Sequence, residues 1–442
     1  MSDGITRRKF LAAAAATGAG LALGGGVFAE SKSSSTVRVG VIGVGGRGTD
    51  LTGTLLSFPY VQIPAICDID KDAAKRAQDL VESKTSKRPA AYTRDETDYE
   101  NLCTRDDLDA IIIATPWEWH ARMAIAGMRA KKCVGSEVPA CVTMQECRDL
   151  IATAEETGTA YMMLENVTYY QNVLAVTRMI REGVFGEMLH AEAGYQHDCR
   201  FLAFLDNGTL TWRGRHMAEK NGNLYPTHPI GPVARWLNIN RGDRFVRLTS
   251  MSTKSRGLRN YASQKFGPDH PLAKRKYALG DTNTTLLETA KGSTVTLYFD
   301  LCTPRPYDLI FRVQGTKATY EGNHDAIHLA GTTPEGEWEK FGTYQEKYEH
   351  PIWRDLSAEA VKTGGHGGGD YIEIHEFLDA VRNRTRPPID VYDAVTWSAI
   401  VPLSIESVAK HGQVLDFPDF TEGKWKTNPV EPIGKTSLVG RL

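Results

Sequence analysis

The glycine-rich segment at residues 43–48 constrains the fold of this chain more than any other feature. It reads Gly-Val-Gly-Gly-Arg-Gly and directly follows the β-rich run Val37 to Val41. Between a strand and a helix, a G-x-G-x-x-G sequence forms a tight turn, lets a pyrophosphate approach the backbone and packs the helix closely on the strand. The segment therefore predicts a doubly wound, dinucleotide-binding α/β domain.

The chain beyond this turn supports the same architecture, because β-rich and helical segments alternate as far as residue 165. Alternation of this kind predicts a parallel sheet with right-handed crossovers. The further strands are expected at Val61 to Cys67, Ala110 to Ala114, Lys132 to Ser136 and Tyr161 to Leu164, and the helices at Lys71 to Val81, Met123 to Ala130 and Thr143 to Thr157. We therefore expect a Rossmann domain over residues 37–165.

The second half, residues 166–442, has a different pattern, in which strands follow one another without intervening helices. Such a pattern indicates an α+β domain with a mainly antiparallel sheet. We expect strands at Met188 to Gln196, Phe245 to Thr253, Thr282 to Ala290, Ser293 to Leu301 and Asp308 to Val313, and helices at Asn172 to Glu182, Tyr371 to Asn383 and Tyr392 to His411.

The N-terminus has the pattern of an export signal. Thr6-Arg7-Arg8-Lys9-Phe10-Leu11 precedes an Ala- and Gly-rich apolar stretch that ends in Val27-Phe28-Ala29. A short, Gly-rich stretch followed by polar residues favours a cleaved signal over a membrane anchor. We expect a twin-arginine signal peptide at 1–29, a linker at 30–36, and a periplasmic or secreted protein without stable membrane association. The twin-arginine route exports proteins that are already folded.

The composition of the chain limits the classes of molecule that it is expected to bind. The net charge of −2 argues against nucleic acid, whose phosphates require a concentrated basic face. The seven cysteines form no C-x-x-C pair, and we expect no metal site. A small-molecule partner is favoured.

The dinucleotide site is expected to use Gly43, Gly45, Gly46 and Gly48, together with the N-terminus of the following helix. Asp68 ends the second predicted strand, about 20 residues later, where a carboxylate accepts hydrogen bonds from ribose hydroxyls and repels a 2'-phosphate. NAD is therefore favoured over NADP. Arg47 is a further cofactor contact, since its side chain can reach a phosphate.

Three other segments follow predicted strands: Pro116-Trp117-Glu118-Trp119-His120, Gly135-Ser136-Glu137-Val138-Pro139 and Glu165-Asn166-Val167. This layout resembles the glucose-fructose oxidoreductase, inositol dehydrogenase and rhizopine-catabolism (Gfo/Idh/MocA) superfamily, whose members carry Glu-Lys-Pro in the second segment. Val138 stands where many relatives have the lysine that shuttles protons, which argues against ordinary dehydrogenase chemistry. The later histidine of the superfamily corresponds to His228, in an expected polar loop without the usual surrounding carboxylates.

The segments that differ from the superfamily pattern resemble those of glycoside hydrolase family 109. The similarity covers essentially the whole mature chain. It is carried by Trp-Glu-Trp-His at 117–120, Gly-Tyr-Gln-His-Asp at 194–198, Leu-Tyr-Pro-Thr-His at 224–228, Gly-His-Gly-Gly at 365–368, Asp-Val-Tyr-Asp-Ala-Val-Thr-Trp at 390–397 and Pro-Asp-Phe-Thr-Glu-Gly-Lys-Trp at 418–425.

The resemblance implies an alpha-N-acetylgalactosaminidase that holds NAD through several turnovers, taking hydride from sugar C3 and later returning it. A C3 ketone acidifies the C2 hydrogen, so that a modest base removes it and the C1 substituent is expelled, before water adds. By matching motifs, Tyr195 is the candidate C2 base and His228 handles the C3 hydroxyl proton. Because the hydride is returned to the sugar, the cycle consumes no NAD, which suits an exported enzyme.

The same resemblance implies two sets of binding residues. The nicotinamide half of the cofactor would contact Trp117, Glu118, Trp119, His120, Glu137, Val138 and Asn166, and the sugar would contact Tyr195, Arg213, Tyr225, Pro226, Thr227, His228 and Tyr307. The glycine-rich segment 364–369 is either a loop that closes over substrate or a simple connector.

Alternatives remain open at this point. An exported sugar oxidoreductase shares the fold and cofactor, a binding protein on a disused Rossmann fold shares the fold, and a two-carboxylate glycosidase leaves the glycine turn unexplained. The exact sugar, the anomer and the oligomeric state also stay open, although a homo-oligomer that pairs through its antiparallel sheets is compatible with the superfamily.

Overall fold

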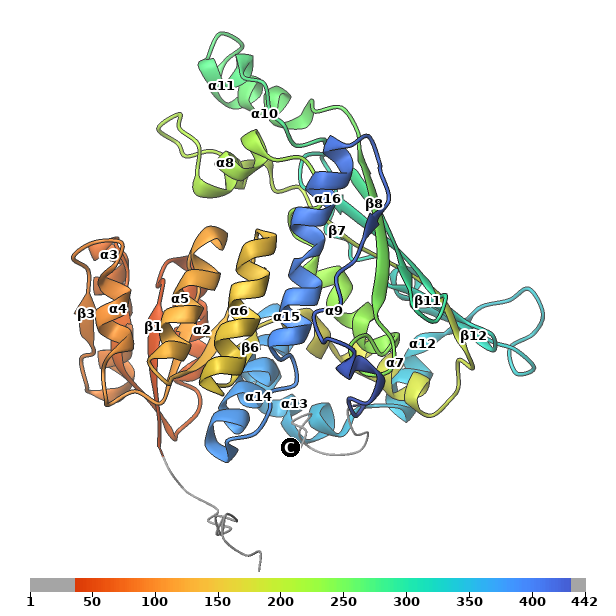
Figure 1. Cartoon of the computed structure of the whole chain (residues 1–442), viewed down its shortest axis with the longest axis horizontal. Coiled ribbons are helices and arrows are strands. Elements are labelled where there is room, and N and C mark those ends of the chain that lie inside the picture. The colour runs from red at the N-terminus through yellow and green to blue at the C-terminus, as the bar shows by residue number, and fades with distance from the viewer. Residues whose placement is uncertain (1–35, 431–442) are drawn as a thin grey trace, which may run out of the picture. The chain divides into compact units, whose positions relative to one another are not determined.

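Six parallel strands form the first sheet. In the computed structural model, which describes residues 36–430, their order across the sheet is β3-β2-β1-β4-β5-β6. The strands are β1 (Val37–Ile42), β2 (Val61–Cys67), β3 (Ala90–Tyr92), β4 (Ala110–Ile113), β5 (Cys133–Ser136) and β6 (Tyr161–Met163), drawn from red to yellow in Figure 1. This order confirms the doubly wound Rossmann prediction.

The local sequence explains why these elements form where they do. All four residues of β4 are apolar and buried, as expected for a central strand covered on both faces. Asp70 caps α3 by accepting from the backbone of Asp72 and Ala73, and Thr143 with Glu146 forms a capping box on α6. The helices of this half are α2 (Gly46–Leu55), α3 (Lys71–Thr85), α4 (Asp98–Cys103), α5 (Trp117–Arg129) and α6 (Met144–Thr157).

The second sheet has nine strands in the order β14-β13-β12-β11-β7-β10-β9-β8-β15. Neighbours are antiparallel except β7 and β10, which pair in parallel, so the prediction of a mainly antiparallel sheet is confirmed. The strands are β7 (Met188–Gln196), β8 (Phe245–Ser252), β9 (Asn283–Thr289), β10 (Thr294–Asp300), β11 (Arg312–Gly315), β12 (Ala318–Glu321), β13 (Ala326–Leu329), β14 (Glu339–Lys340) and β15 (Leu415–Asp416).

Two late helices return to the first sheet. Helix α14 packs against α2 and β1, and α15 packs against α6 and β6. The contact with β5 is close, since a Cβ at Gly135 would lie 3.3 Å from the ring of Phe377. The helices of this half are α7 (Gln171–Arg181), α8 (Trp212–Glu219), α9 (Thr227–Trp236), α10 (Gly257–Phe266), α11 (Pro271–Lys274), α12 (Phe341–Lys347), α13 (Pro351–Thr363), α14 (Gly369–Asn383), α15 (Val391–Ser398) and α16 (Ile400–Ala409).

Three expected elements differ in the structure. The helix predicted over Tyr392 to His411 is two helices, because Pro402 has no N–H to donate to the carbonyl of Ser398. The strand predicted from Asp308 begins only at Arg312, because the backbone turns at Ile310. The helix predicted from Met123 begins at Trp117, where Pro116 occupies the N-cap position.

The predicted signal peptide, and all of the linker except Thr36, lie outside the described residues. Within residues 36–430, no helix combines the length and the apolar character needed to cross a bilayer.

Candidate functional site

The glycine turn between β1 and α2 leaves room for a ligand on one side only. Gly43 has φ +82°, and a Cβ there would lie 2.7 Å from the Thr115 side chain. A Cβ at Gly48 would lie 1.8 Å from the carbonyl oxygen of Gly43, so only glycine lets α2 approach β1 this closely. At Gly45 and Gly46, by contrast, a Cβ would meet no atom of the described chain within 4 Å. The turn therefore has an open side at the N-terminus of α2, which fits a pyrophosphate.

Asp68 lies at the end of β2 and is tied to this turn. One carboxylate oxygen accepts from the Val44 N–H at 2.8 Å, and the other accepts from the Asp70 N–H at 2.9 Å. These bonds hold the carboxylate beside the turn, which is the position predicted for the ribose contact.

Five residues predicted for the site gather into one aromatic cluster. The Tyr195 ring on β7 lies 4.9 Å from Tyr225, 5.2 Å from His228 and 5.9 Å from Tyr307, measured between centroids. Trp117 stacks on Tyr225 at 5.3 Å. Trp117 follows β4, and β4 neighbours β1, so this cluster and the glycine turn share the carboxyl edge of the first sheet.

Arg213 of α8 lies beside the aromatic cluster. Its guanidinium lies 5.1 Å from the Trp117 ring and 5.9 Å from the Tyr225 ring. Burial raises the pKa of Tyr195 above its usual value, and the positive charge of Arg213 opposes that rise. Arg213 is thus a nearby positive charge that favours the ionised form of Tyr195, although burial has the larger effect on its pKa.

His228 differs from its prediction in two respects. It lies on the first turn of α9 and is buried, rather than standing in a polar loop. It also has a carboxylate partner, because its Nδ1 lies 2.7 Å from Oε1 of Glu165, a residue that the sequence reasoning left without a role. The sequence feature that could have identified Glu165 is its position in the segment Glu165-Asn166-Val167, directly after β6.

Several polar atoms around this pair are buried without a hydrogen-bond partner in the described chain. They are Oε2 of Glu165, Oδ1 of Asn166 and Oγ1 of Thr227. Because buried polar atoms are nearly always hydrogen-bonded, these three atoms are available to a ligand. Pro226 occupies the N-cap position of α9, directly before Thr227.

The other residues of the Trp-Glu-Trp-His segment, Glu118, Trp119 and His120, make separate contacts. His120 is buried, and its ring nitrogens face the carbonyl oxygens of Pro139 and Thr115 at 2.8 and 2.7 Å, so it holds two loops together instead of lining a pocket. Trp119 packs edge-on against Tyr99, with ring centroids 6.5 Å apart. Glu118 accepts from Nε2 of His216 across 2.9 Å.

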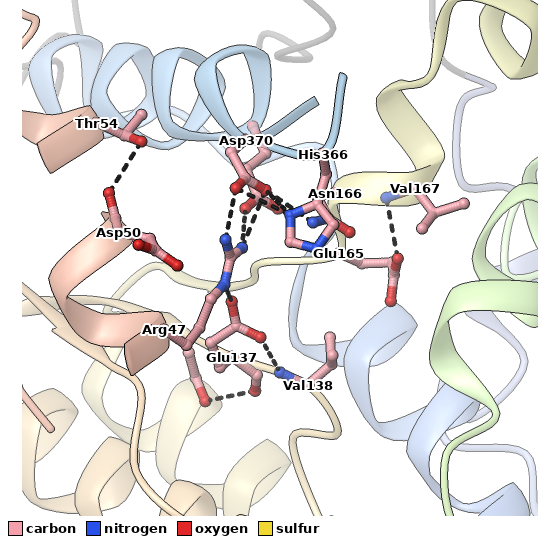
Figure 2. A network of polar contacts seen from close by, with 12 residues as sticks. Arg47, Asp50, Thr54, Glu137, Val138, Glu165, Asn166, Val167, His366 and Asp370 are labelled. Atoms are coloured by element: carbon pink, nitrogen blue, oxygen red, sulfur yellow. Dashed lines mark hydrogen bonds and ion pairs between the residues drawn. The ribbon is translucent and has the colours of Figure 1, made fainter. Parts of the chain in front are cut away.

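The Arg47 side chain, predicted as a further cofactor contact, is held by carboxylates of the protein in this structure. Its Nε donates to Glu137 at 2.5 Å, and its Nη1 donates to Asp370 of α14 at 2.5 Å. A longer contact, of 3.3 Å, reaches Glu373. Figure 2 shows the guanidinium between Glu137 and Asp370. Arg47 therefore joins the glycine turn, the end of β5 and helix α14.

Asp370 is the centre of this polar network. It also accepts from the Asn166 amide at 2.7 Å and from Nδ1 of His366 at 3.0 Å (Figure 2). Burial alone would raise the pKa of Asp370, but the bonds from His366 and Arg47 outweigh it and hold the pKa well below its usual value. For Glu373, burial and the nearby charge of Asp370 raise the pKa. The network thus places a carboxyl group with a lowered pKa beside one with a raised pKa.

The segment 364–369 owes its shape to glycine and to this network. The residues from Gly364 to Gly368 all have positive φ, including His366 at +45°. The bond to Asp370 holds His366 beside Asn166. Val138 is buried, and its N–H donates to the Glu137 carboxylate at 3.1 Å. Within residues 36–430, no group of three or more His, Cys, Asp or Glu is placed to hold a metal ion.

Two family models match the chain. Residues 37–165 match an oxidoreductase family with an NAD-binding Rossmann fold, and residues 169–427 match the C-terminal domain of glycosyl hydrolase 109. A glycosyl hydrolase family 109 protein of Stenotrophomonas maltophilia (strain K279a) is 43% identical over 441 residues, covering 95% of this chain and 96% of that protein. An alpha-N-acetylgalactosaminidase of Tannerella forsythia is 43% identical over 415 residues, covering 89% and 88%.

Solved structures share the fold at low identity. An oxidoreductase domain protein from Kribbella flavida has a TM-score of 0.68 at 18% identity, covering 87% of this chain and 100% of its own. A levoglucosan dehydrogenase in complex with NADH has a TM-score of 0.67 at 19% identity, with the same coverage.

Proposed function

The chain belongs to glycosyl hydrolase family 109, and on that premise we propose that this glycoside hydrolase releases terminal N-acetylgalactosamine while holding NAD through repeated turnovers. The choice of sugar is supported by the name of the Tannerella forsythia relative. The single observation that carries the proposal is the aromatic cluster around Tyr195 and His228 at the same sheet edge as the open glycine turn. A sugar ring held in this cluster would lie at the same sheet edge as the cofactor, beside the two proposed catalytic groups.

The residues present fit a dinucleotide. The open side of the turn at Gly45 and Gly46 would hold the pyrophosphate, and Asp68 would hold the ribose and disfavour a 2'-phosphate. The amide oxygen of Asn166 and the indole of Trp117 would face the nicotinamide half. NAD rather than NADP is therefore expected, and mass spectrometry of the nucleotide released from denatured enzyme tests this choice.

When bound, NAD supplies a reversible hydride acceptor for sugar C3. His228 is assigned to the C3 hydroxyl proton, with Glu165 stabilising the charged imidazolium. Tyr195 is assigned to the hydrogen at C2, which a carbonyl at C3 makes acidic. Tyr225 and Tyr307 lie next to Tyr195, and Arg213 lies over the Tyr225 ring; these three residues would hold the sugar. Because the C1 substituent leaves by elimination next to the C3 carbonyl, this mechanism does not need the two carboxylates that flank the scissile bond in ordinary glycosidases.

The decisive experiment follows deuterium from solvent into the product. Enzyme and nitrophenyl N-acetylgalactosaminide are incubated in deuterated water, and the released sugar is examined by NMR. The proposal expects deuterium at C2, no net change in NAD content, and loss of hydrolysis after the nucleotide is stripped. If the protein were instead an exported sugar oxidoreductase, which is the alternative function, an oxidised sugar would accumulate in proportion to the reduced cofactor. Full activity without nucleotide would reject the proposal.

We also propose that the protein is exported, already folded, to the periplasm. The Arg7-Arg8 pair and the apolar stretch behind it support the twin-arginine route. Loading NAD in the cytoplasm before export fits an enzyme that recycles its cofactor. The test is an Arg7→Lys, Arg8→Lys double substitution, which should leave the full-length precursor in the cytoplasm, while wild type appears shortened in the periplasmic fraction.

A further inference from the structure

Asn166 is buried, and only one end of its side-chain amide has a partner among the described residues. Its Nδ2 donates to Oδ1 of Asp370 at 2.7 Å (Figure 2). Its Oδ1 is buried and accepts no hydrogen bond from the described chain. Because buried polar atoms are nearly always hydrogen-bonded, this oxygen is an acceptor that a ligand can satisfy.

Asp370 decides which end of that amide is left free. An ionised carboxylate only accepts hydrogen bonds, so the NH2 group of Asn166 must face it and the amide oxygen must face away. The carboxylate also accepts from Nη1 and Nη2 of Arg47 at 2.5 and 3.1 Å, and from Nδ1 of His366 at 3.0 Å. These donors, together with the position of Asp370 in the first turn of α14, favour its ionised form and hold it in place.

Backbone packing keeps the two residues together. Asn166 begins the short 3-10 helix η1 (Asn166–Tyr169), and α14, which carries Asp370, packs against it. A Cβ at Gly369 would lie 2.8 Å from the carbonyl oxygen of Asn166, so glycine allows this close approach. The orientation of the Asn166 amide is therefore set by a residue 204 positions later in the chain.

The free oxygen of Asn166 selects the kind of group that it meets. A ligand must present a donor to it, because an acceptor would leave two oxygens facing each other without a hydrogen between them. The neighbouring Glu165 also leaves a buried acceptor, Oε2, without a partner in the described chain. Asn166 is expected to contact the nicotinamide half of NAD, and the N–H donor of the nicotinamide ring is its carboxamide NH2.

We propose that Asp370 is a positioning residue for the cofactor, which turns the Asn166 amide so that its oxygen accepts from the carboxamide NH2 of nicotinamide. The site thereby selects NAD over dinucleotides that lack this donor. This inference rests on the proposed function, because it takes Asn166 to contact the nicotinamide. It adds a role for α14 in the choice of cofactor, exerted through Asn166.

The test is a competition for the holoenzyme. Purified enzyme is equilibrated with NAD and one competing dinucleotide, and the nucleotides recovered from the denatured protein are quantified by mass spectrometry. One competitor carries nicotinic acid, which replaces the NH2 by an oxygen and adds a negative charge. The other carries 3-acetylpyridine, which replaces the NH2 by a methyl group without changing the charge. We expect wild type to prefer NAD by about 100-fold over the first and by about tenfold over the second.

Asp370→Asn removes the constraint on the amide. The new side chain can donate to the Asn166 oxygen, so the NH2 of Asn166 is free to face the ligand. We expect the preference for NAD over the acetylpyridine analogue to fall to about twofold or less. A purely structural defect would weaken the binding of both dinucleotides alike and leave their ratio unchanged. Asp370→Glu keeps the charge and should keep most of the preference, and Asp355→Asn, at an exposed position on α13, is the matched control.

The acetylpyridine analogue separates the hydrogen bond from the effect of charge. If Asp370→Asn changed the preference over the nicotinic acid analogue alone, the lost charge would account for it and the inference would be overturned. Wild-type enzyme that takes up the acetylpyridine analogue as readily as NAD also overturns it, whether or not Asp370→Asn folds. Wild-type enzyme that retains no dinucleotide at all would instead reject the proposed function, and this inference with it.

Discussion

The carboxylate of Glu165 and Nδ1 of His228 are 2.7 Å apart, although 63 positions separate the two residues in the chain. An ionised carboxylate only accepts, so Nδ1 carries the proton and donates. Oε1 of Glu165 accepts a second bond, from the Val167 N–H at 3.1 Å, which fixes the carboxylate. In the neutral ring this arrangement leaves Nε2 as the acceptor, the form required to take a proton from a sugar hydroxyl.

Glu165→Gln tests this pair. The amide keeps the size of the side chain but removes its charge, so it no longer stabilises a protonated His228 or favours one tautomer. We expect kcat to fall by about 100-fold, with little change in KM and in NAD content. Steady-state kinetics on the nitrophenyl glycoside measures the effect. Glu187→Gln, an exposed residue at the start of the second sheet, is the control. Equal kcat in both variants would show that the pair has no catalytic role.

Tyr195→Phe separates the C2 step from the C3 step. The substitution removes the hydroxyl but keeps the ring contacts with Tyr225 and His228. We expect hydrolysis to fall by about 1000-fold and deuterium exchange at C2 to disappear, whereas sugar still reduces the bound nucleotide. NMR of the recovered sugar and the absorbance of NADH give the two readouts. Tyr298→Phe, on β10, is the matched control. Exchange at the wild-type rate in Tyr195→Phe would assign the base elsewhere.

Two glycine substitutions are expected to have opposite consequences. Gly48→Ala forces a Cβ to within 1.8 Å of a backbone oxygen, so α2 must shift and the melting temperature should fall by several degrees. Gly45→Ala meets no atom of the described chain within 4 Å, and its φ of −65° suits alanine, so stability without nucleotide should be retained while NAD is lost. Thermal melts of nucleotide-free protein and the nucleotide content of purified protein distinguish the two. Full NAD content in Gly45→Ala would contradict the assignment of the pyrophosphate.

Asp370 links stability to pH. Its pKa is lowered in the folded protein, so its stabilising contribution is complete above the unfolded-state pKa of about 4 and is lost as pH falls below that value. Asp370→Asn leaves Arg47 short of a buried partner, and the free energy of unfolding at pH 7 should drop by about 3 kcal/mol. Urea denaturation should show a smaller difference from wild type at pH 3 than at pH 7.

The control for this substitution is Asp355→Asn, an exposed position on α13 that should change neither value. A difference between wild type and Asp370→Asn that is the same at both pH values would mean that the folded protein does not depress the pKa of Asp370.

Local spacing was enough to predict the first sheet. The glycines at 43, 45 and 48 act within a single turn, and β1, β2 and β4 to β6 are short apolar runs whose burial follows from composition alone. Only β3 was missed, because a strand of three largely exposed residues is too short to show a strand pattern. Motifs likewise named Tyr195, Tyr225, His228 and Tyr307, and the fold brings them together.

What the sequence by itself determined is the Rossmann sheet, the family and the residue types of the site, because these depend on neighbours within a few positions. Only the tertiary structure decided which charges meet. The pairing of His228 with Glu165 and of Arg47 with Asp370 spans 63 and 323 positions, and no local periodicity encodes such distances. The orientation of the Asn166 amide was decided in the same way, since Asp370 lies 204 positions later in the chain.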